Sequence, residues 1–454
     1  MDPLSLLDLG ARPDAAVILS QRGALTRGEA LLEGAHVAAE LERAGAAGAP
    51  VVISLDSGTG FLASLVGAWM AGCTPVLLDP LVRHELVRAI ARTSARAVIR
   101  SELAAADGTE LGVPVLSPRG LRAEAPRAAP EIPDGAPLVF LYTSGSTGEP
   151  AIVAKSFEQL DVEHRFYTGL YGERLRVATL APWCHILGFI VSFVVPIRGG
   201  GCCDLVAGIS PKTVLDRAAA GLVDVVVAVP AILRVMVRML ERSGSVALPA
   251  ACRFCSAGAP ISAELRREFA AATGVVVTDV YGSTEAGAMA YRHDDGPWRA
   301  QPHVEWRIAE GGHLEVRSPT VSETVAGRGE FFRTGDLVRA EGDGFVLEGR
   351  ADDVVKIGGR RVSLEEIRKV LEELPGVAAA AVAVEEVRGE ARLVAFLEAP
   401  GAAAPPPEEV KAFVRARLAD YKVPRAVHSV RAFPTNPGGK PDKRKLLAEL
   451  SAKG

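Results

Sequence analysis

The chain has 454 residues, of which 48% are hydrophobic and 23% charged, shares typical of a globular protein. Its 51 basic side chains nearly balance 55 acidic ones, and the net charge is -4. No long basic run supplies the electrostatic footprint that nucleic acid requires, so we expect no nucleic-acid partner. The length allows about three domains of roughly 150 residues and therefore a large core.

The N-terminus and the apolar segments bear on localisation. Met1 is followed by Asp2 and Pro3, without the basic segment and apolar stretch of a signal peptide, so we expect a cytoplasmic protein. The longest apolar stretch, residues 186–197, is shorter than the roughly 20 residues that a membrane-spanning helix needs. We predict that it forms a buried helix and that the chain has no membrane span.

The six cysteines are predicted to be buried free thiols, because most lie in apolar, strand-like stretches where a thiol packs as a small hydrophobe. Cys252 and Cys255 form a C-x-x-C pair, but no second pair follows at the spacing of a zinc site. We therefore expect no metal or redox role for them.

In chain order, the first part alternates short β-rich runs with helical stretches, which predicts a mostly parallel sheet. Strands are expected at residues 51–55 and 75–78, with a helix at 61–71 between them. Residues 121–136 are rich in Ala, Pro and charge and predict an exposed connection, followed by a strand at 138–142. A second alternating set has expected strands at 177–180, 223–229, 253–256 and 275–281 and helices at 231–242 and 262–272. The pattern predicts an α/β fold with two doubly wound lobes.

After residue 302 the pattern changes to short strands with Gly turns, which predicts a small β subdomain that ends at residues 344–349. Beyond it we expect a hairpin at 353–361, helices at 363–374 and 407–418, two strands between these helices and a final strand near Val430. The predicted division is an N-terminal domain over residues 1–350 and a smaller α+β C-terminal domain over 351–454.

A loop dense in small and hydroxyl residues follows the strand at 138–142 and is a candidate phosphate cradle. Glycines let backbone N–H groups turn toward phosphate oxygens, and Ser and Thr hydroxyls add donors. The residues in question are Thr143, Ser144, Gly145, Ser146, Thr147 and Gly148. The loop is not a Walker motif, and a flexible Ser/Gly connection would have the same composition.

A second candidate follows the strand at 275–281, where Tyr281, Thr284 and Glu285 project from one turn. The ring can stack on a base, the hydroxyl can bind a phosphate oxygen, and the carboxylate can hold Mg²⁺, which prefers oxygen ligands. A plain strand-end turn is the alternative. Further on, Asp336 follows a Gly turn and is suited to accept hydrogen bonds from both ribose hydroxyls.

Taken in order, these motifs resemble those of the superfamily of acyl- and aryl-CoA synthetases, nonribosomal adenylation domains and luciferases. The resemblance covers the chain from about Pro50 onward. The matching segments are residues 142–150, 182–188, 256–260, 281–287, 333–336, 349–361 and 437–440. It implies an AMP-forming ligase that uses ATP and Mg²⁺ to activate a carboxylic acid and passes the acyl group to CoA or to the phosphopantetheine of a carrier protein.

The resemblance also implies roles for individual residues. Tyr281 would stack on adenine, Asp336 and Arg350 would contact the ribose, and Thr147 and Glu285 would hold the metal. Lys440 would enter the site during adenylation, with Thr284, Glu285 and His185 as the other catalytic residues. Nucleotide-binding positions would also include Gly258, Ala259, Pro260, Gly282 and Ser283.

In this superfamily the small domain rotates between two half-reactions. Asp352 would be the hinge, and the segment with Lys356, Gly358 and Gly359 would line the thiol tunnel. Absent side chains let a pantetheine arm approach closely, although a tight hairpin turn would also explain the two glycines. Arg361 would contact phosphates of the thiol donor.

The segment at residues 182–189 matches the acyl pocket of the superfamily, and it lacks the aspartate by which members specific for amino acids bind the α-ammonium group. This absence favours a simple acyl or aryl acid. His185 could instead be a core histidine, and residues 189–193 are expected to be core.

One position departs from the superfamily pattern. The residue after Pro150 is usually a phosphate-binding lysine, and here it is Ala151, with Lys155 nearby. A nucleotide-binding regulator without catalysis, or adenylation with a non-thiol acceptor, are the alternative functions.

Overall fold

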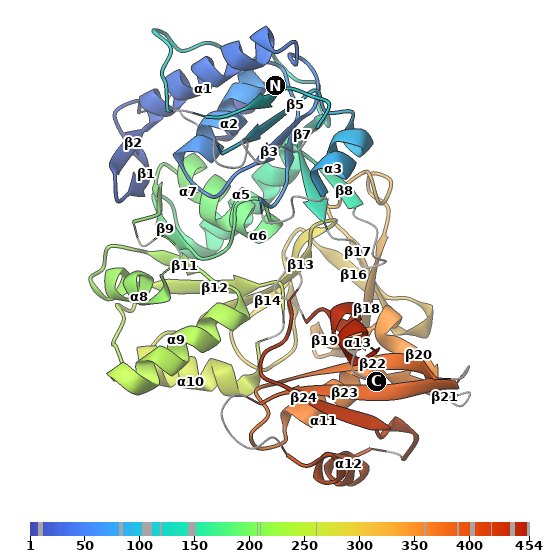
Figure 1. Cartoon of the computed structure of the whole chain (residues 1–454). Coiled ribbons are helices and arrows are strands. Elements are labelled where there is room, and N and C mark those ends of the chain that lie inside the picture. Colours follow the sequence, from blue (N-terminus) through green and yellow to red (C-terminus); the bar gives the residue numbers. More distant parts are fainter. Residues whose placement is uncertain are drawn as a thin grey trace. The chain divides into compact units, whose positions relative to one another are not determined.

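The computed structural model of the chain describes all residues except 8–11, 81–84, 102–110, 119, 144–150, 207, 209, 260, 358–359, 388–389, 400–404, 419, 436–440 and 452–454. It contains two compact units, which are described separately (Figure 1). Unit 1 comprises residues 1–305 and 317–332, and unit 2 comprises residues 306–316 and 333–454.

The first sheet of unit 1 has the strand order β6-β5-β3-β4-β7-β8. All neighbours are parallel except β7 and β8. The strands are β3 (Val51–Ser54), β4 (Pro75–Leu77), β5 (Ala97–Arg100), β6 (Val115–Leu116), β7 (Pro137–Thr143) and β8 (Ala151–Ser156). The parallel arrangement expected from the alternation is confirmed.

Helices α1 (Arg27–Arg43) and α2 (Thr59–Met70) pack against each other in this lobe. A Cβ atom on Gly34 would lie 2.4 Å from Val66 Cγ1, and one on Gly67 would lie 2.6 Å from Val37 Cβ. Because nothing larger than glycine fits at these points, the two helix backbones can approach closely. Two more helices of this part of the chain are η1 (Pro3–Leu6), near the N-terminus, and α3 (Leu86–Thr93), between β4 and β5.

The second sheet of unit 1 has the order β15-β14-β13-β12-β11-β9-β10-β1-β2, with parallel pairing from β13 to β1. Its strands are β1 (Ala16–Ser20), β2 (Gly23–Thr26), β9 (Arg176–Thr179), β10 (Cys202–Asp204), β11 (Val225–Val227), β12 (Arg253–Ala257), β13 (Val277–Ser283), β14 (Gly287–Arg292) and β15 (Arg299–Ala300). The connecting helices are α5 (Phe157–Tyr171), α8 (Pro211–Ala219), α9 (Pro230–Ser243) and α10 (Ala263–Thr273). The N-terminal hairpin thus belongs to the second lobe.

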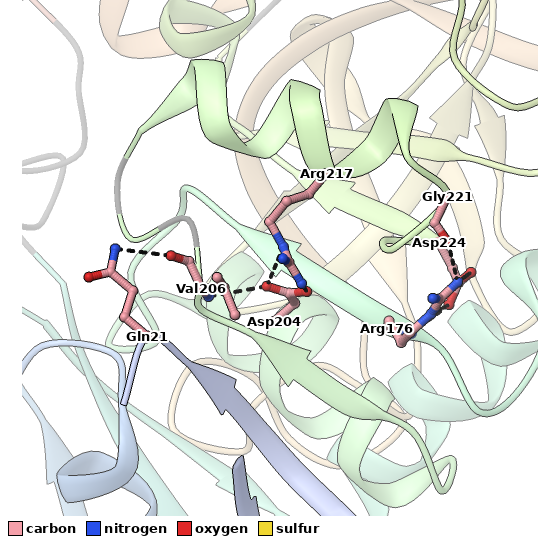
Figure 2. Close-up of polar contacts among 7 residues, drawn as sticks. All are labelled: Gln21, Arg176, Asp204, Val206, Arg217, Gly221 and Asp224. Carbon is pink, nitrogen blue, oxygen red and sulfur yellow. Dashed lines mark hydrogen bonds and ion pairs between the residues drawn. The ribbon is translucent and has the colours of Figure 1, made fainter. Parts of the chain in front are cut away.

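Two arginine–aspartate pairs hold opposite ends of the neighbouring interior strands β10 and β9 of this sheet (Figure 2). Arg217 of α8 binds both carboxylate oxygens of Asp204, which ends β10 and is only 1% exposed. Arg176 at the start of β9 binds Asp224 and also donates to the carbonyl of Gly221 at 2.9 Å. An arginine that makes several charge-assisted hydrogen bonds to one carboxylate fixes its orientation better than a single bond would. These pairs therefore hold the ends of the two strands in position.

The apolar stretch at 186–197 is buried and helical, as predicted. It consists of α6 (Ile186–Phe189), the π-helical η3 (Ile190–Val194) and α7 (Val195–Arg198). Pro196 follows the wide turn, and because proline has no N–H, it cannot donate to the carbonyl four residues earlier. Across the described residues, no helix combines the length and apolar character needed to cross a membrane.

The described residues of unit 2 form three small sheets. Its strands are β16 (Glu305–Ile308), β17 (His313–Arg317), β18 (Phe332–Glu341), β19 (Gly344–Arg350), β20 (Val354–Ile357), β21 (Arg360–Ser363), β22 (Ala379–Val387), β23 (Glu390–Glu398) and β24 (Ala426–Val430). Its helices are η4 (Glu310–Gly312), η5 (Ala351–Asp353), α11 (Leu364–Glu372), α12 (Pro407–Arg415), η6 (Asp420–Lys422) and α13 (Lys443–Ser451). The four-stranded sheet β16-β17-β18-β19 groups with the C-terminal elements here, whereas the sequence pattern assigned it to the N-terminal domain. A mobile domain that begins at residue 351 stays a prediction.

Candidate functional site

The predicted site segments of unit 1 follow the carboxyl ends of parallel strands. Thr143 ends β7, Gly258 and Ala259 follow β12, and Tyr281, Gly282 and Ser283 end β13. Ligands of open α/β sheets bind outside this edge, because the strand-to-helix loops meet there. The segments singled out from the sequence therefore lie where such a fold binds small molecules.

The turn after β13 carries the aromatic, hydroxyl and carboxylate groups that were predicted to bind nucleotide. The ring centroids of Tyr281 and Trp298 lie 5.6 Å apart, with an angle of 53° between the ring planes. The guanidinium carbon of Arg292 lies 4.3 Å from the centroid of the Trp298 ring. A Cβ atom on Gly282 would lie 2.4 Å from the carbonyl oxygen of Gly287, so only glycine fits where β13 and β14 close the turn. Trp298 was not predicted as a site residue.

Buried polar groups hold the backbone of this turn. The Nζ atom of Lys155, on β8, donates to the carbonyl oxygens of Glu285 at 3.1 Å and Thr320 at 2.7 Å. Glu163, on α5, accepts a 2.8 Å hydrogen bond from the N–H of Ala288. Lys155 and Glu163 are 2% and 3% exposed. The Lys155 amine therefore points toward these two carbonyl oxygens.

Burial dominates the electrostatics of both charged groups. It lowers the pKa of the Lys155 amine, against the opposing effect of the carboxylates of Glu163 and Glu285. It likewise raises the pKa of the Glu163 carboxyl, against the effect of Lys155 and of the Ala288 N–H. Each group thus favours the charged form of the other within the interior of unit 1.

The side chains of Thr284 and Glu285 are partly accessible, in contrast to the buried groups that hold their backbone. Among the described residues, no hydrogen bond or ion pair to the Glu285 carboxylate is found. A carboxylate with accessible oxygens fits a hard cation such as Mg²⁺. Gly258, with φ at +88° and no neighbouring atom within 4 Å of a Cβ atom, adds open space at the end of β12.

In unit 2, the structure brings together the two residues that were predicted to contact the ribose. Asp336 and Arg350 are paired across β18 and β19, and Arg350 Nη1 lies 3.4 Å from Asp336 Oδ1. A Cβ atom on Gly335 would lie 2.2 Å from Arg350 Nη2, so the glycine makes room for the guanidinium. The Thr334 hydroxyl accepts from the Asp336 N–H at 3.2 Å and orients the strand.

His185 precedes α6 and lies in a small polar group within unit 1. Its Nε2 atom is 3.3 Å from Oδ2 of the buried Asp79, and Cys184 belongs to the same group. Burial lowers the pKa of His185, but Asp79 and Cys184 outweigh it and raise this pKa to about 10. The ring is 34% exposed, so it is not a fully enclosed core histidine. Asp79 was missed, although its place just after β4 could have indicated it.

The aromatic residues next to His185 are core, as predicted. Phe189 and Phe193 are fully buried, with ring centroids 5.6 Å apart. Trp183 packs against Phe193 and against Phe61 of α2. The six cysteines are buried and unpaired, which confirms the expected free thiols.

Several predicted site residues lie outside the described residues, namely Ser144, Gly145, Ser146, Thr147, Gly148, Pro260, Gly358, Gly359 and Lys440. Only the backbone is described for Thr143, Asp352, Lys356 and Arg361. Their roles stay predictions.

The family follows from comparison with known proteins. The family model described as AMP-binding enzyme matches residues 8–336, and that of the AMP-binding enzyme C-terminal domain matches residues 366–440. The chain belongs to the AMP-binding enzyme family. This confirms the superfamily resemblance and the fold class expected from the sequence.

Individual relatives agree with this assignment. The chain is 27% identical to a sulfoacetate–CoA ligase of Cupriavidus necator, over 96% of this chain and 95% of the relative. It is 34% identical to a 2,3-dihydroxybenzoate-AMP ligase of Bacillus subtilis, over 43% of this chain and 42% of the relative. Among solved structures, the amide bond synthetase McbA from Marinactinospora thermotolerans is similar, with a TM-score of 0.84, 26% identity and 99% of each chain covered.

Proposed function

We propose that this chain activates a carboxylic acid as its acyl-adenylate and then transfers the acyl group to a thiol of CoA or a carrier protein. In the first step a carboxylate oxygen attacks the α-phosphorus of ATP and pyrophosphate leaves. In the second step the thiol sulfur attacks the acyl carbonyl and AMP leaves. The carrying observation is that predicted nucleotide-binding segments lie at the carboxyl ends of parallel strands in both sheets of unit 1, in a chain of the AMP-binding enzyme family.

The geometry suits nucleotide binding in two places. The turn with Thr284 and Glu285 offers a hydroxyl and an accessible carboxylate, and Glu285 with Thr147 would hold the metal ion. Mg²⁺ would neutralise charge on the triphosphate, since attack of a carboxylate on phosphate brings anions together. Asp336 and Arg350 offer an acceptor and a donor side by side, which suits ribose hydroxyls.

The acid is proposed to be a simple acyl or aryl acid. The pocket segment has no acidic residue of its own, and the carboxylate nearest to His185 is Asp79, whose charge the imidazolium of His185 balances. An α-ammonium group would thus meet a neutralised pair and not a lone carboxylate. The relatives named as acid–CoA and aryl-AMP ligases support this choice.

The acceptor has an alternative to a thiol, because one similar structure is named as an amide bond synthetase. An amine acceptor is therefore the second candidate. Acid-dependent release of pyrophosphate from ATP, screened over acids, tests the first half-reaction. The same reactions with CoA, with a phosphopantetheinylated carrier protein or with an amine distinguish the acceptors. No pyrophosphate release with any acid, despite ATP binding, would favour a non-catalytic regulator.

Two variants test the proposed alternation between half-reactions. A bulky residue at Gly359 should block thiol transfer while single-turnover pyrophosphate release survives. Asp352→Pro should leave one half-reaction intact, because proline fixes φ near -65° and cannot follow a hinge movement. Loss of both half-reactions in a folded Asp352→Pro protein would contradict the hinge.

A further inference from the structure

The backbone of the turn at Thr284 and Glu285 is held at two points by ionisable side chains of other elements. Lys155 donates to the carbonyl of Glu285, on the entering side of the turn. Glu163 accepts from the N–H of Ala288, on the leaving side. The two side chains therefore fix the backbone at Glu285 itself and at Ala288, three residues later.

The second carbonyl bound by Lys155 belongs to Thr320, in a segment that contacts the same turn. The Thr320 hydroxyl donates to the carbonyl of Ala286 at 2.7 Å, and the N–H of Ser322 donates to that of Glu285 at 2.8 Å. The Ser322 hydroxyl in turn donates to the carbonyl of Ala154 on β8 at 2.7 Å. The Lys155 amine thus joins strand β8, the turn and this third segment in one buried network.

The turn is shaped around the Glu163 carboxylate. Gly287 has φ at +74°, and a Cβ atom there would lie 1.9 Å from Glu163 Oε1. Only glycine satisfies both the left-handed backbone and the close approach of the carboxylate. Any side chain at this position would displace Glu163 or the turn.

Stability alone is a poor reason for this arrangement. Desolvating two charges is costly, and well-packed apolar residues of similar volume are often as stabilising as a buried ion pair. What the two groups add is direction, since an amine and a carboxylate each fix a particular backbone atom. They do so without occupying the side chains of Thr284 and Glu285.

We propose that Lys155 and Glu163 are positioning residues that hold the turn of Thr284 and Glu285 in place for the metal-bound triphosphate. The inference rests on the proposed function, since it assigns the turn to that ligand. It predicts that the pair acts on the adenylation half-reaction and on its metal requirement. Thioester formation from supplied acyl-adenylate needs no triphosphate and should be spared.

The test is Lys155→Met, which keeps the chain length and removes all three donors. Misplacement of a reacting group by about 1 Å can cost on the order of 100-fold, so we expect adenylation to fall by about 10- to 100-fold. We expect the Mg²⁺ concentration for half-maximal ATP binding, measured by calorimetry without acid, to rise by a similar factor. Lys155→Arg should restore part of both, because it keeps a cation with donors.

Arg27→Met is the matched control. Arg27 lies on α1, is 1% exposed and donates to the carbonyls of Leu7 and Ile197, so it too is a buried cation bound to backbone oxygen. Both variants should lower the melting temperature, but only Lys155→Met should change the Mg²⁺ dependence. Equal Mg²⁺ dependence in the two variants, or equal loss in both half-reactions of Lys155→Met, would overturn the proposal.

Glu163→Gln provides a second variant in case Lys155→Met does not fold. The amide oxygen can still accept from Ala288, but the negative charge beside Lys155 is lost. We expect a folded protein with a smaller rise in Mg²⁺ requirement, and an unchanged requirement would contradict the proposal. If Lys155→Met weakens Mg²⁺-dependent ATP binding while the wild type releases no pyrophosphate with any acid, the positioning role stands and the proposed function fails.

Discussion

The two candidate nucleotide-binding regions differ in how deeply their polar groups are buried. Around Glu285, an amine, a carboxylate and the segment with Thr320 and Ser322 bind the backbone through buried hydrogen bonds. The hydrogen bond from Arg350 Nη1 to Asp336 Oδ1 is 3.4 Å long, and the Arg350 side chain is 36% exposed. Buried bonds lose more when broken than exposed ones, because no water replaces the partner.

The difference indicates a division of labour. Under the proposed function, the buried bonds would hold the turn of unit 1 in place before ligand arrives, as required for groups that must meet developing charge during adenylyl transfer. The pair in unit 2 is more exposed, which suits the proposed recognition of a neutral ribose. Changes to the turn should therefore affect both stability and the metal requirement, and changes to the pair should affect ATP affinity alone.

The largest effect is expected from Gly287→Ala, because the added Cβ atom would displace the Glu163 carboxylate or the turn itself. A left-handed alanine costs about 1 to 2 kcal/mol, and overpacking against Glu163 adds about 1 to 3, so the free energy of unfolding should fall by about 2 to 5 kcal/mol. Denaturant unfolding measures this loss, and adenylation should fall with it. Gly274→Ala is the control, because Gly274 has φ at +73° with no atom within 4 Å of a Cβ atom. Equal destabilisation by both variants would mean that Glu163 does not shape the turn.

Lys440→Ala tests the charge that the superfamily resemblance brings to the site. Removing one preorganised donor to a transition state costs about 10²- to 10³-fold in rate, and we expect this loss in adenylation only. Thioester formation from supplied acyl-adenylate should be nearly unchanged. Lys445→Ala, at an exposed position on α13, is the control. Equal loss in both half-reactions would contradict the role of Lys440.

Much of the fold was predictable because hydrophobic periodicity reports it directly. The alternating strands and helices of unit 1 and the elements of unit 2 were found near their expected positions. The pairing of β1 with β10 was not predictable, since Ile18 and Cys203 lie far apart in the sequence. Neither helix α5 nor the helix α1 was predicted, because their apolar faces are interrupted by polar residues.

The two groups that hold the turn show what the sequence contains but does not explain. Lys155 shares the inward face of β8 with Val153, as the period of a strand requires, and Glu163 shares the buried face of α5 with Leu160 and Tyr167. A charged residue on an otherwise apolar face is rarely buried without a partner. The pattern therefore predicts that both residues have a polar partner. Because these partners are backbone atoms of a turn far away in the sequence, only the three-dimensional structure identifies the partners.

Asp336→Asn tests the more exposed region, the pair of Asp336 and Arg350. A hydrogen bond to a charged group contributes about 1.5 to 3 kcal/mol, so we expect the KM for ATP to rise by about 10- to 100-fold. The Mg²⁺ requirement and the melting temperature should change little, in contrast to Lys155→Met. Asp343→Asn, in the exposed turn between β18 and β19, removes the same charge from the same unit. An equal rise in KM for this control would exclude a specific contact by Asp336.

The smallest effect is a gain, expected from Ala151→Lys at the start of β8. The superfamily resemblance leads us to expect a phosphate-binding lysine here, and Lys155 does not replace it, because its amine binds the carbonyls of Glu285 and Thr320. A charge-assisted hydrogen bond contributes about 1.5 to 3 kcal/mol. We expect the new lysine to recover part of this free energy, so the KM for ATP should fall by up to about tenfold. Ala47→Lys, exposed in the loop between α1 and β3, adds the same charge elsewhere. A fall in KM for Ala151→Lys but not for Ala47→Lys would place phosphate near residue 151. No change in either variant would mean that the cradle at residues 143–148 binds the triphosphate without help from this position.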